Sequence, residues 1–144
     1  MQDIPQDQDI PQDKKEIITA LSREEITEIL KTSKDLSGID LRKANLSKID
    51  FSGCNLSAAN LSYAICKDCN FQNCNLSEAS LWNANLEGAN LSGANLESCD
   101  LDYTKLLGAV LYQANIRRAQ LPVDLIPREE IMRSVQQGSK ISRR

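Results

Sequence analysis

Cysteine and carboxylate side chains are the residues of this sequence whose types could support chemistry. The 144-residue chain contains five cysteines, and Cys66 and Cys69 form a Cys-x-x-Cys pair of the kind found in zinc and redox sites. It contains no histidine, which removes the most common general base and metal ligand. No carboxylate pair has a supporting group, and no nucleophile motif, phosphate-binding loop or nucleotide fingerprint occurs. We therefore predict a non-enzymatic protein that uses no cofactor, metal or small-molecule substrate.

The positions of the cysteines within a period of five residues favour a structural role over a chemical one. From Leu36 to Leu121, every fifth residue is large and apolar at nearly all positions, and the residue two before it is mostly Ala. Four cysteines fall on the small position and one on the large position: Cys54, Cys69, Cys74 and Cys99, and then Cys66. We interpret them as buried hydrophobic side chains that replace Ala or Leu in register.

This period of five is the dominant signal of the sequence. An α-helix needs apolar residues near a spacing of 3.6 and a plain strand needs a spacing of 2, so neither accommodates it. The period of five is accommodated by a three-residue strand segment with two side chains pointing inward, followed by a two-residue turn. Five glycines fall on the second turn residue, where a positive φ costs glycine little. A chain that turns at every fifth residue must coil into a solenoid.

The large apolar residues of the repeat are expected to form a continuous core ladder. Its members are Leu36, Leu41, Leu46, Phe51, Leu56, Leu61, Phe71, Leu76, Leu81, Leu86, Leu91, Leu96, Leu101, Leu106, Leu111 and Ile116.

The repeated unit Ala-Asn-Leu, as in residues 84–86 and 89–91, resembles the consensus of the pentapeptide-repeat family. The resemblance covers residues 34–123, which hold 18 repeats. It implies an all-β solenoid, a right-handed parallel four-sided β-helix, here of about 4.5 coils. On such a coil Cys54 and Cys74 would stack, although parallel Cβ directions make the geometry for a disulfide poor. Many members of the family occur in cyanobacteria, so the resemblance implies a cyanobacterial type of protein.

Helical caps are expected at both ends, because a solenoid otherwise exposes its strand edges and core. Residues 1–13 repeat Gln-Asp-Ile-Pro-Gln-Asp and are predicted to be a disordered tail. Residues 14–33 are predicted to form an N-terminal cap of one or two helices. Ser22, followed three residues later by Glu25, is a capping box. Ile26 then begins an apolar helix face.

The C-terminal cap is predicted over residues 124–138. Pro127 is suited to be the first residue of a helix. Ile131, Met132 and Val135 are expected to face the last coil.

Gly138 is expected to end that helix, because glycine is common just after a helix C-terminus. Residues 139–144 are predicted to be a short basic tail, interpreted as a solvated terminus, with contact to an anionic partner as the alternative.

Charge and hydropathy exclude several partners. The body, residues 34–121, holds 9 acidic and 8 basic residues, so nucleic acid is an unlikely ligand. No stretch approaches the ~20 apolar residues of a membrane span. The acidic N-terminus lacks the apolar run of a secretory signal, and with five cysteines this predicts a cytoplasmic protein with reduced thiols.

Three aromatic residues are the candidate partner-binding patch. On the coil that the resemblance implies, Tyr63, Trp82 and Tyr103 are turn residues on the same side of three successive coils. Exposed aromatic residues are typical anchors of protein interfaces. The alternative is that the three rings only stack on one another and cover the turns.

A second, weaker patch is predicted near the C-terminal end of the rod. It consists of Leu107, Val110 and Tyr112.

We therefore predict a non-enzymatic protein whose rigid surface binds a protein partner, with homodimerisation as an open option. The alternative is a DNA-mimicking protein that binds gyrase or another topoisomerase, a role that the pentapeptide-repeat family includes. That role requires a strongly acidic rod, whereas the 9 acidic and 8 basic residues of 34–121 nearly cancel.

Overall fold

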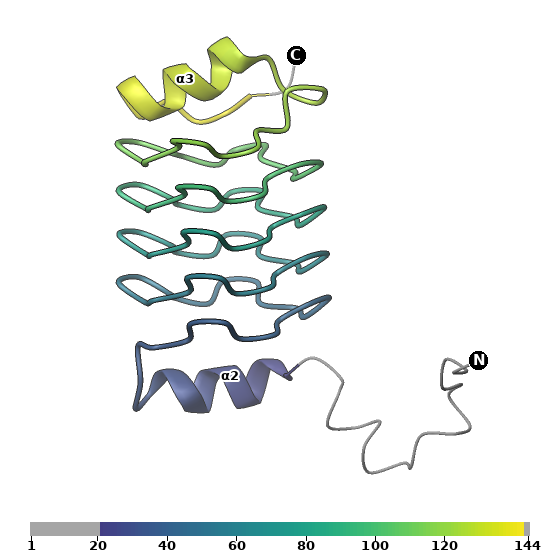
Figure 1. Ribbon diagram of the computed structural model, residues 1–144, viewed down its shortest axis with the longest axis vertical. Coiled ribbons are helices and arrows are strands. Elements are labelled where there is room, and N and C mark those ends of the chain that lie inside the picture. Colours follow the sequence, from purple (N-terminus) through teal and green to yellow (C-terminus); the bar gives the residue numbers. More distant parts are fainter. Residues whose placement is uncertain (1–20, 143–144) are drawn as a thin grey trace, which may run out of the picture.

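The protein is a rod of stacked coils with a helix across each end (Figure 1). The structure is a computed structural model and describes residues 21–142. The helix α2 (Arg23–Leu30) precedes the first coil and α3 (Arg128–Gln137) follows the last one. The expected tail of residues 1–13 and the first part of the N-terminal cap, residues 14–20, lie outside the described residues.

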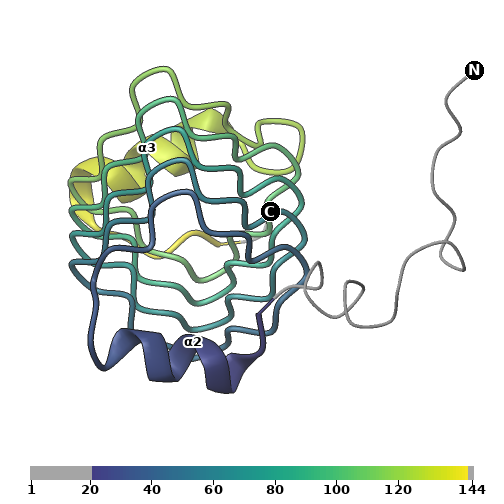
Figure 2. The same ribbon diagram turned by 60° about the horizontal axis from the view of Figure 1, so that its bottom comes forward.

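The coils are joined by single-residue parallel bridges, each of which pairs residues 20 positions apart. Fourteen such bridges run from Asp35↔Asn55 to Asp100↔Gln120. Because 20 residues are four repeats of five, each coil has four walls around one central column, which Figure 2 shows obliquely. Every bridge uses two backbone hydrogen bonds: Leu86 N donates to Lys105 O (2.8 Å) and Lys105 N donates to Ala84 O (3.0 Å) in one example.

The turns between walls explain why the residue between the two inward positions is so often Asn or Asp. In the turn that follows Asn85, Ala89 N donates to Leu86 O (3.0 Å), and Gly88 has φ = 73°. Gly88 is the second of the two turn residues, and a positive φ at that residue is the mark of a type II turn. The Asn85 Oδ1 accepts a hydrogen bond from Glu87 N (3.0 Å), which fixes the entry to the turn.

The same hydrogen bond is made by all thirteen Asn and Asp residues at this position between Asp35 and Asn115. The Ser37 hydroxyl also donates to Asp35 and lowers the pKa of that carboxyl. The Arg42 guanidinium, which donates to Asp40, lowers the pKa of Asp40 in the same way. The carboxylates at this position of the repeat therefore stabilise the turns by accepting hydrogen bonds.

The inward side chains of the four walls form a single core. The structure buries fifteen members of the expected core ladder, from Leu36 to Leu111, at 3% exposure or less. Phe51 and Phe71, on adjacent coils, stack with ring centroids 5.3 Å apart. Ile116 differs from the expectation, because it is only partly buried. It lies on the final coil, which has no further coil above it, so burial there depends on the residues after Pro122 that cover each wall.

The helix α2 covers the N-terminal end of the core. The Ser22 hydroxyl accepts from Glu25 N (3.1 Å), and the Glu25 carboxylate accepts from Ser22 N (3.0 Å), which is a complete capping box. Ile26 is fully buried, and Ile29 and Leu30 pack against the core beside it.

The helix α3 covers the C-terminal end, with two corrections to the expected details. Pro127 is the residue before the helix and not its first residue. Met132 does not pack on the core; Ile131, Ser134 and Val135 lie against the last coil, as a spacing of three and four residues on one helix face requires. The Ser134 hydroxyl accepts a hydrogen bond from Leu111 N (2.9 Å). It thereby replaces the carbonyl oxygen that a further coil would supply.

The segment after α3 also differs from the expectation. Gly138 ends the helix in the left-handed conformation, with φ = 76°. The prediction of a solvated tail is wrong at Ile141, which is 2% exposed. Ile141 N donates to Ala109 O (2.9 Å), and Gly108 N donates to Ile141 O (2.6 Å). An apolar side chain together with two backbone bonds therefore attaches this segment to the last coil.

Candidate protein-binding surface

The cysteines occupy the core and form no metal site. All five are free and buried. Among residues 21–142, no group of three or more Cys, Asp, Glu or His side chains could hold a metal ion. Burial raises the pKa of Cys74 and of Cys99 to about 12. Contact with the Cys69 thiol, together with burial, raises the pKa of Cys66 well above its ordinary value. Cys66, Cys74 and Cys99 are therefore protonated at neutral pH, and all five thiols are inaccessible.

Native protein is accordingly expected to react with iodoacetamide at least ~100-fold more slowly than the unfolded chain, because labelling requires opening of the rod. Mass spectrometry after labelling in denaturant should find five modified cysteines. Rapid labelling of the native protein, or fewer than five modified cysteines after unfolding, would contradict the inward placement of free thiols.

The structure brings the three aromatic side chains of the candidate patch together on one corner of the rod. The Tyr63 and Trp82 rings have centroids 5.2 Å apart, and the Trp82 and Tyr103 rings 5.9 Å apart, both edge to face at 80°. Tyr63 is 46% exposed and Tyr103 is 51% exposed, whereas Trp82 between them is half-buried. We call Tyr63, Trp82 and Tyr103 the aromatic ridge.

The backbone of the coils sets the geometry of the aromatic ridge. Tyr63 and Tyr103 occupy the second turn position with φ of 61° and 59°, and Trp82 occupies the first turn position of the coil between them. Tyr63 N donates to Trp82 O (2.9 Å), so the hydrogen bonds between coils hold neighbouring ridge residues in place. The ridge is thus rigid before any partner binds.

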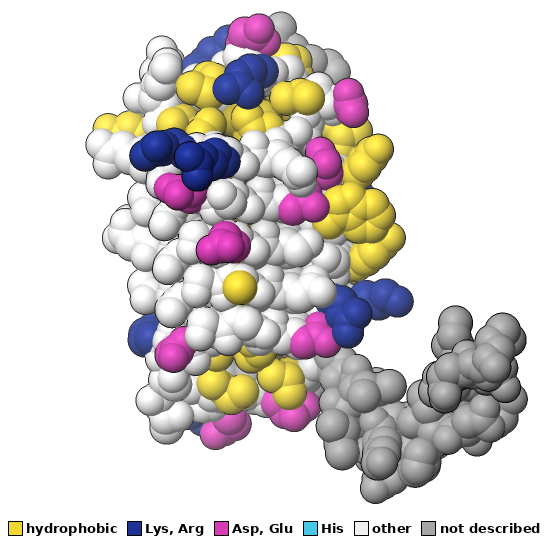
Figure 3. Space-filling model, viewed as in Figure 1, with side chains coloured by type: hydrophobic (Ala, Val, Ile, Leu, Met, Phe, Trp, Pro, Cys, Tyr) yellow, Lys and Arg dark blue, Asp and Glu magenta, His cyan; other side chains and the backbone are white. Residues whose placement is uncertain are grey.

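Two further apolar side chains are exposed, one beside Tyr63 in the sequence and one after the last coil. Figure 3 shows hydrophobic side chains gathered along one edge of the rod over successive coils. Ile65, two residues after Tyr63 on the next wall, is 39% exposed, and Val123, after the last coil, is 50% exposed. Neither residue is part of the predicted patch, because Ile65 replaces the usual Asn of the repeat and Val123 follows the last regular turn. At the same corner of the first coil, Arg42 pairs with Asp40 at 2.8 Å.

The residues of the second, weaker patch are exposed to different degrees and form a less continuous surface than the aromatic ridge. Leu107 and Tyr112 are 39% and 41% exposed, and Val110 is half-buried. The Tyr112 ring lies close to Gly138, where an added Cβ would be 3.3 Å from the ring. Tyr112 therefore covers the end of α3.

Within residues 21–142, the helices lack the length and the apolar composition of a membrane-spanning segment.

The solved structures that are similar to this chain include the following three pentapeptide-repeat proteins. HetL of the cyanobacterium Nostoc, involved in the regulation of heterocyst differentiation, is 35% identical with a TM-score of 0.61, over 61% of this chain and 40% of HetL. A second Nostoc pentapeptide-repeat protein is 33% identical with a TM-score of 0.62, over 70% of this chain and 88% of its own. A protein of the Arabidopsis thaliana thylakoid lumen is 35% identical with a TM-score of 0.54, over 54% of each chain. The match thus spans less than two thirds of HetL and of the Arabidopsis protein.

No curated protein sequence matches the chain significantly.

The sequence model of the family, described as pentapeptide repeats, matches 8 copies in residues 35–65, 54–93, 64–102 and 89–122. These segments cover the coils from the first bridge to the last. The fold of this family is a right-handed four-sided β-helix, which agrees with the 20-residue offset of every bridge. The chain belongs to the pentapeptide-repeat family.

Proposed function

We propose that this protein is a non-enzymatic interaction module that binds a protein partner through the aromatic ridge. The observation that carries the proposal is the geometry of Tyr63, Trp82 and Tyr103, three aromatic side chains stacked on one corner of a rigid rod. Two of them, Tyr63 and Tyr103, remain about half exposed on this corner. Exposed Trp and Tyr side chains are the residues most enriched among the energetic anchors of protein interfaces.

Pre-organisation supports the proposal. Binding normally costs the conformational entropy of the side chains that become ordered at the interface. In the aromatic ridge, edge-to-face contacts at 5.2 and 5.9 Å already fix the rings. A partner that covers the ridge would therefore gain apolar burial with little further ordering of this chain.

Affinity capture from the native cell tests the proposal, with the wild type compared with the triple variant Tyr63→Ala, Trp82→Ala, Tyr103→Ala. We expect the triple variant to bind the captured partner at least ~100-fold more weakly, because each anchor contributes about 2 kcal/mol or more. The variant also loses two ring contacts, so its free energy of unfolding should fall by about 1–3 kcal/mol. Binding must be measured well below its melting temperature.

Tyr112→Ala is the matched control, because it removes a similarly exposed aromatic ring from a different corner. This variant should retain the partner. Equal binding by wild type and triple variant, with both folded, would show that the rings only cover their turns.

We also propose a cytoplasmic location. The five free, buried thiols support it, because reduced cysteines are usual in that compartment. Cell fractionation with an antibody against the chain tests it, and recovery in an oxidising compartment would contradict it.

A further inference from the structure

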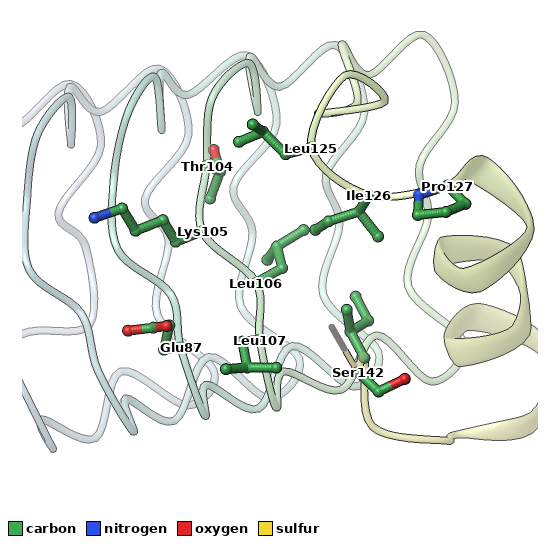
Figure 4. Close-up of a pocket in the computed structure, with 10 residues that line it drawn as sticks. Glu87, Thr104, Lys105, Leu106, Leu107, Leu125, Ile126, Pro127 and Ser142 are labelled. Carbon is green, nitrogen blue, oxygen red and sulfur yellow. The ribbon is translucent and has the colours of Figure 1, made fainter. Parts of the chain in front are cut away.

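The apolar surfaces of the rod differ in what this chain places over them. At the C-terminal end, residues after the last coil and residues 104–107 line a pocket of about 320 Å³. In Figure 4, Ile126 lies beside Leu106; Ile126 packs against the core, and Leu106 is only 1% exposed. The chain therefore covers its own core at this end. The aromatic ridge is not covered in this way within residues 21–142, since Tyr63 and Tyr103 remain about half exposed.

The first 13 residues contain a repeated unit whose chemistry suits the aromatic ridge. The sequence Gln-Asp-Ile-Pro-Gln-Asp occurs at residues 2–7 and again at residues 8–13. Its only apolar residues are the adjacent Ile and Pro. Proline-containing segments in the polyproline II conformation dock on surfaces lined by Trp and Tyr in several classes of recognition domain. Either unit therefore offers an apolar pair of the kind that binds such a surface.

The charges of this segment and of the N-terminal side of the ridge are opposite. Residues 1–13 hold four Asp and no basic residue. Lys43 lies at the same corner as Tyr63, one coil nearer the N-terminal end, and Lys43 N donates to Ser62 O (3.0 Å). The Lys43 side chain is exposed, and in the part of the chain that the structure describes it forms no salt bridge. An acidic segment is therefore attracted to this end of the ridge.

Either unit lies close enough in the chain to reach the ridge. The ten residues from Pro11 to Leu21, the first described residue, span up to about 33 Å when extended. Trp82 lies two coils above the first, a rise of about 10 Å. The axis of α2, packed below the first coil, adds about 10 Å. The segment can therefore cover the ridge of its own chain without opening the rod.

We propose that an Ile-Pro unit of residues 1–13 docks on the aromatic ridge of the same chain and competes there with the protein partner. The inference rests on the proposed function, because it assigns a regulator to the same ridge. The proline ring packs against Trp82, and a neighbouring Asp faces Lys43. The Tyr103 end is less suited, because Asp102 adjoins it and repels an acidic segment. The tether supplies an effective concentration of about a millimolar, so a weak contact is mostly occupied.

Trp82 is the only tryptophan of the chain, so its fluorescence reports whether the ridge is covered. In the full chain, the double isoleucine variant, Ile4→Asp with Ile10→Asp, removes the apolar side chain of both units. The control, Gln2→Asp with Gln8→Asp, adds the same two charges at polar positions. We expect acrylamide to quench Trp82 about twofold more strongly in the double isoleucine variant than in the wild type or the control, because the segment then leaves the ridge.

A peptide with the sequence of residues 1–13 tests the contact directly. Added to the double isoleucine variant, it should shift the Trp82 emission to shorter wavelength in a saturable way. The wild type should need about tenfold more peptide, because its own segment competes. In the variant background, Lys43→Glu should weaken peptide binding about threefold. Lys48→Glu, at another exposed turn residue with nearly the same φ, should not.

Equal quenching of Trp82 in the wild type and in both variants, or an unchanged emission at about millimolar peptide, would overturn the proposal. Quenching that increases when the wild type is diluted would also overturn it, because a second copy would then cover the ridge.

The fluorescence experiments contain no partner, so they are independent of the capture experiment. If the segment competes, the double isoleucine variant should bind the captured partner about tenfold more tightly than the wild type. Ridge-dependent capture with an unresponsive Trp82 would refute the docking of the segment alone. A responsive Trp82, with capture that the triple Ala variant leaves unchanged, would refute the proposed function alone.

Discussion

Replacing Leu86 by Asp is expected to destabilise the rod by more than about 4 kcal/mol, one of the largest effects of any single substitution. Leu86 is fully buried on one wall, between Cys66 below and Leu106 above. The substitution loses the burial of a large side chain, about 1.5–3 kcal/mol, and forces a carboxyl group into an apolar column without a partner. Urea unfolding followed by circular dichroism measures the change, and an insoluble variant would agree with it.

Asn85→Asp is the matched control, because it places the same carboxylate one residue earlier on the outer surface. Asp100 already accepts from Asp102 N (2.9 Å) at the equivalent position of another repeat. We therefore expect the control to change the free energy of unfolding by less than about 0.5 kcal/mol. Similar urea midpoints for Leu86→Asp and the wild type would show that residue 86 does not face the core.

Replacing Ala89 by Leu is expected to cause the second large loss in the free energy of unfolding. Ala89 is fully buried in the column of small residues, between Cys69 and Ala109 on the adjacent coils. Bridges below and above it fix the wall, so the backbone cannot move outward without breaking hydrogen bonds. Overpacking of a rigid core costs about 1–3 kcal/mol, and occasionally more, and we expect the upper end of that range.

The control for this prediction is the same substitution at Ala58, an exposed turn residue with φ = 57°. Leu has a Cβ as Ala does, so the turn conformation is no more strained, and the added atoms lie in solvent. Ala58→Leu should leave the thermal midpoint within a few degrees of the wild type. A larger loss at Ala58 than at Ala89 would reverse the assignment of inner and outer positions.

The period of five made the coils predictable from the sequence, because it is physically incompatible with a helix or a plain strand. The number of walls came from the family resemblance, since the period alone does not set it. The turn conformation was predicted at the glycines. It was not predicted at residues such as Tyr63, Tyr103 and Lys43, which adopt positive φ of 59–63° only because the surrounding coil requires it.

The ends of the rod were less predictable, because each uses local interactions that occur once. Ile141 is a single apolar residue in a polar segment, and its two bonds to the last coil depend on where α3 ends. The half-buried position of Ile116 and the missing bridge above Lys105 both follow from the departure of the chain at Pro122. No pattern in the sequence shows how far the chain then rises from the coil.

The aromatic ridge was predicted from the sequence only in part. The 20-residue coil was enough to place Tyr63, Trp82 and Tyr103 on one corner. The edge-to-face geometry and the half-buried state of Trp82 required the structure. Its role in binding remains a proposal that the capture experiment tests.

Methyl–methyl contacts measured by NMR on the leucine-labelled chain test the stacked-coil account most directly. The account predicts nuclear Overhauser contacts from Leu56 to Leu76 and from Leu76 to Leu96, each across one 20-residue coil, because the bridges hold these residues on the same wall. It also predicts that a soluble paramagnetic agent leaves these methyl signals unaffected. Contacts restricted to residues three or four apart, or strong broadening of all three leucines by the agent, would contradict it.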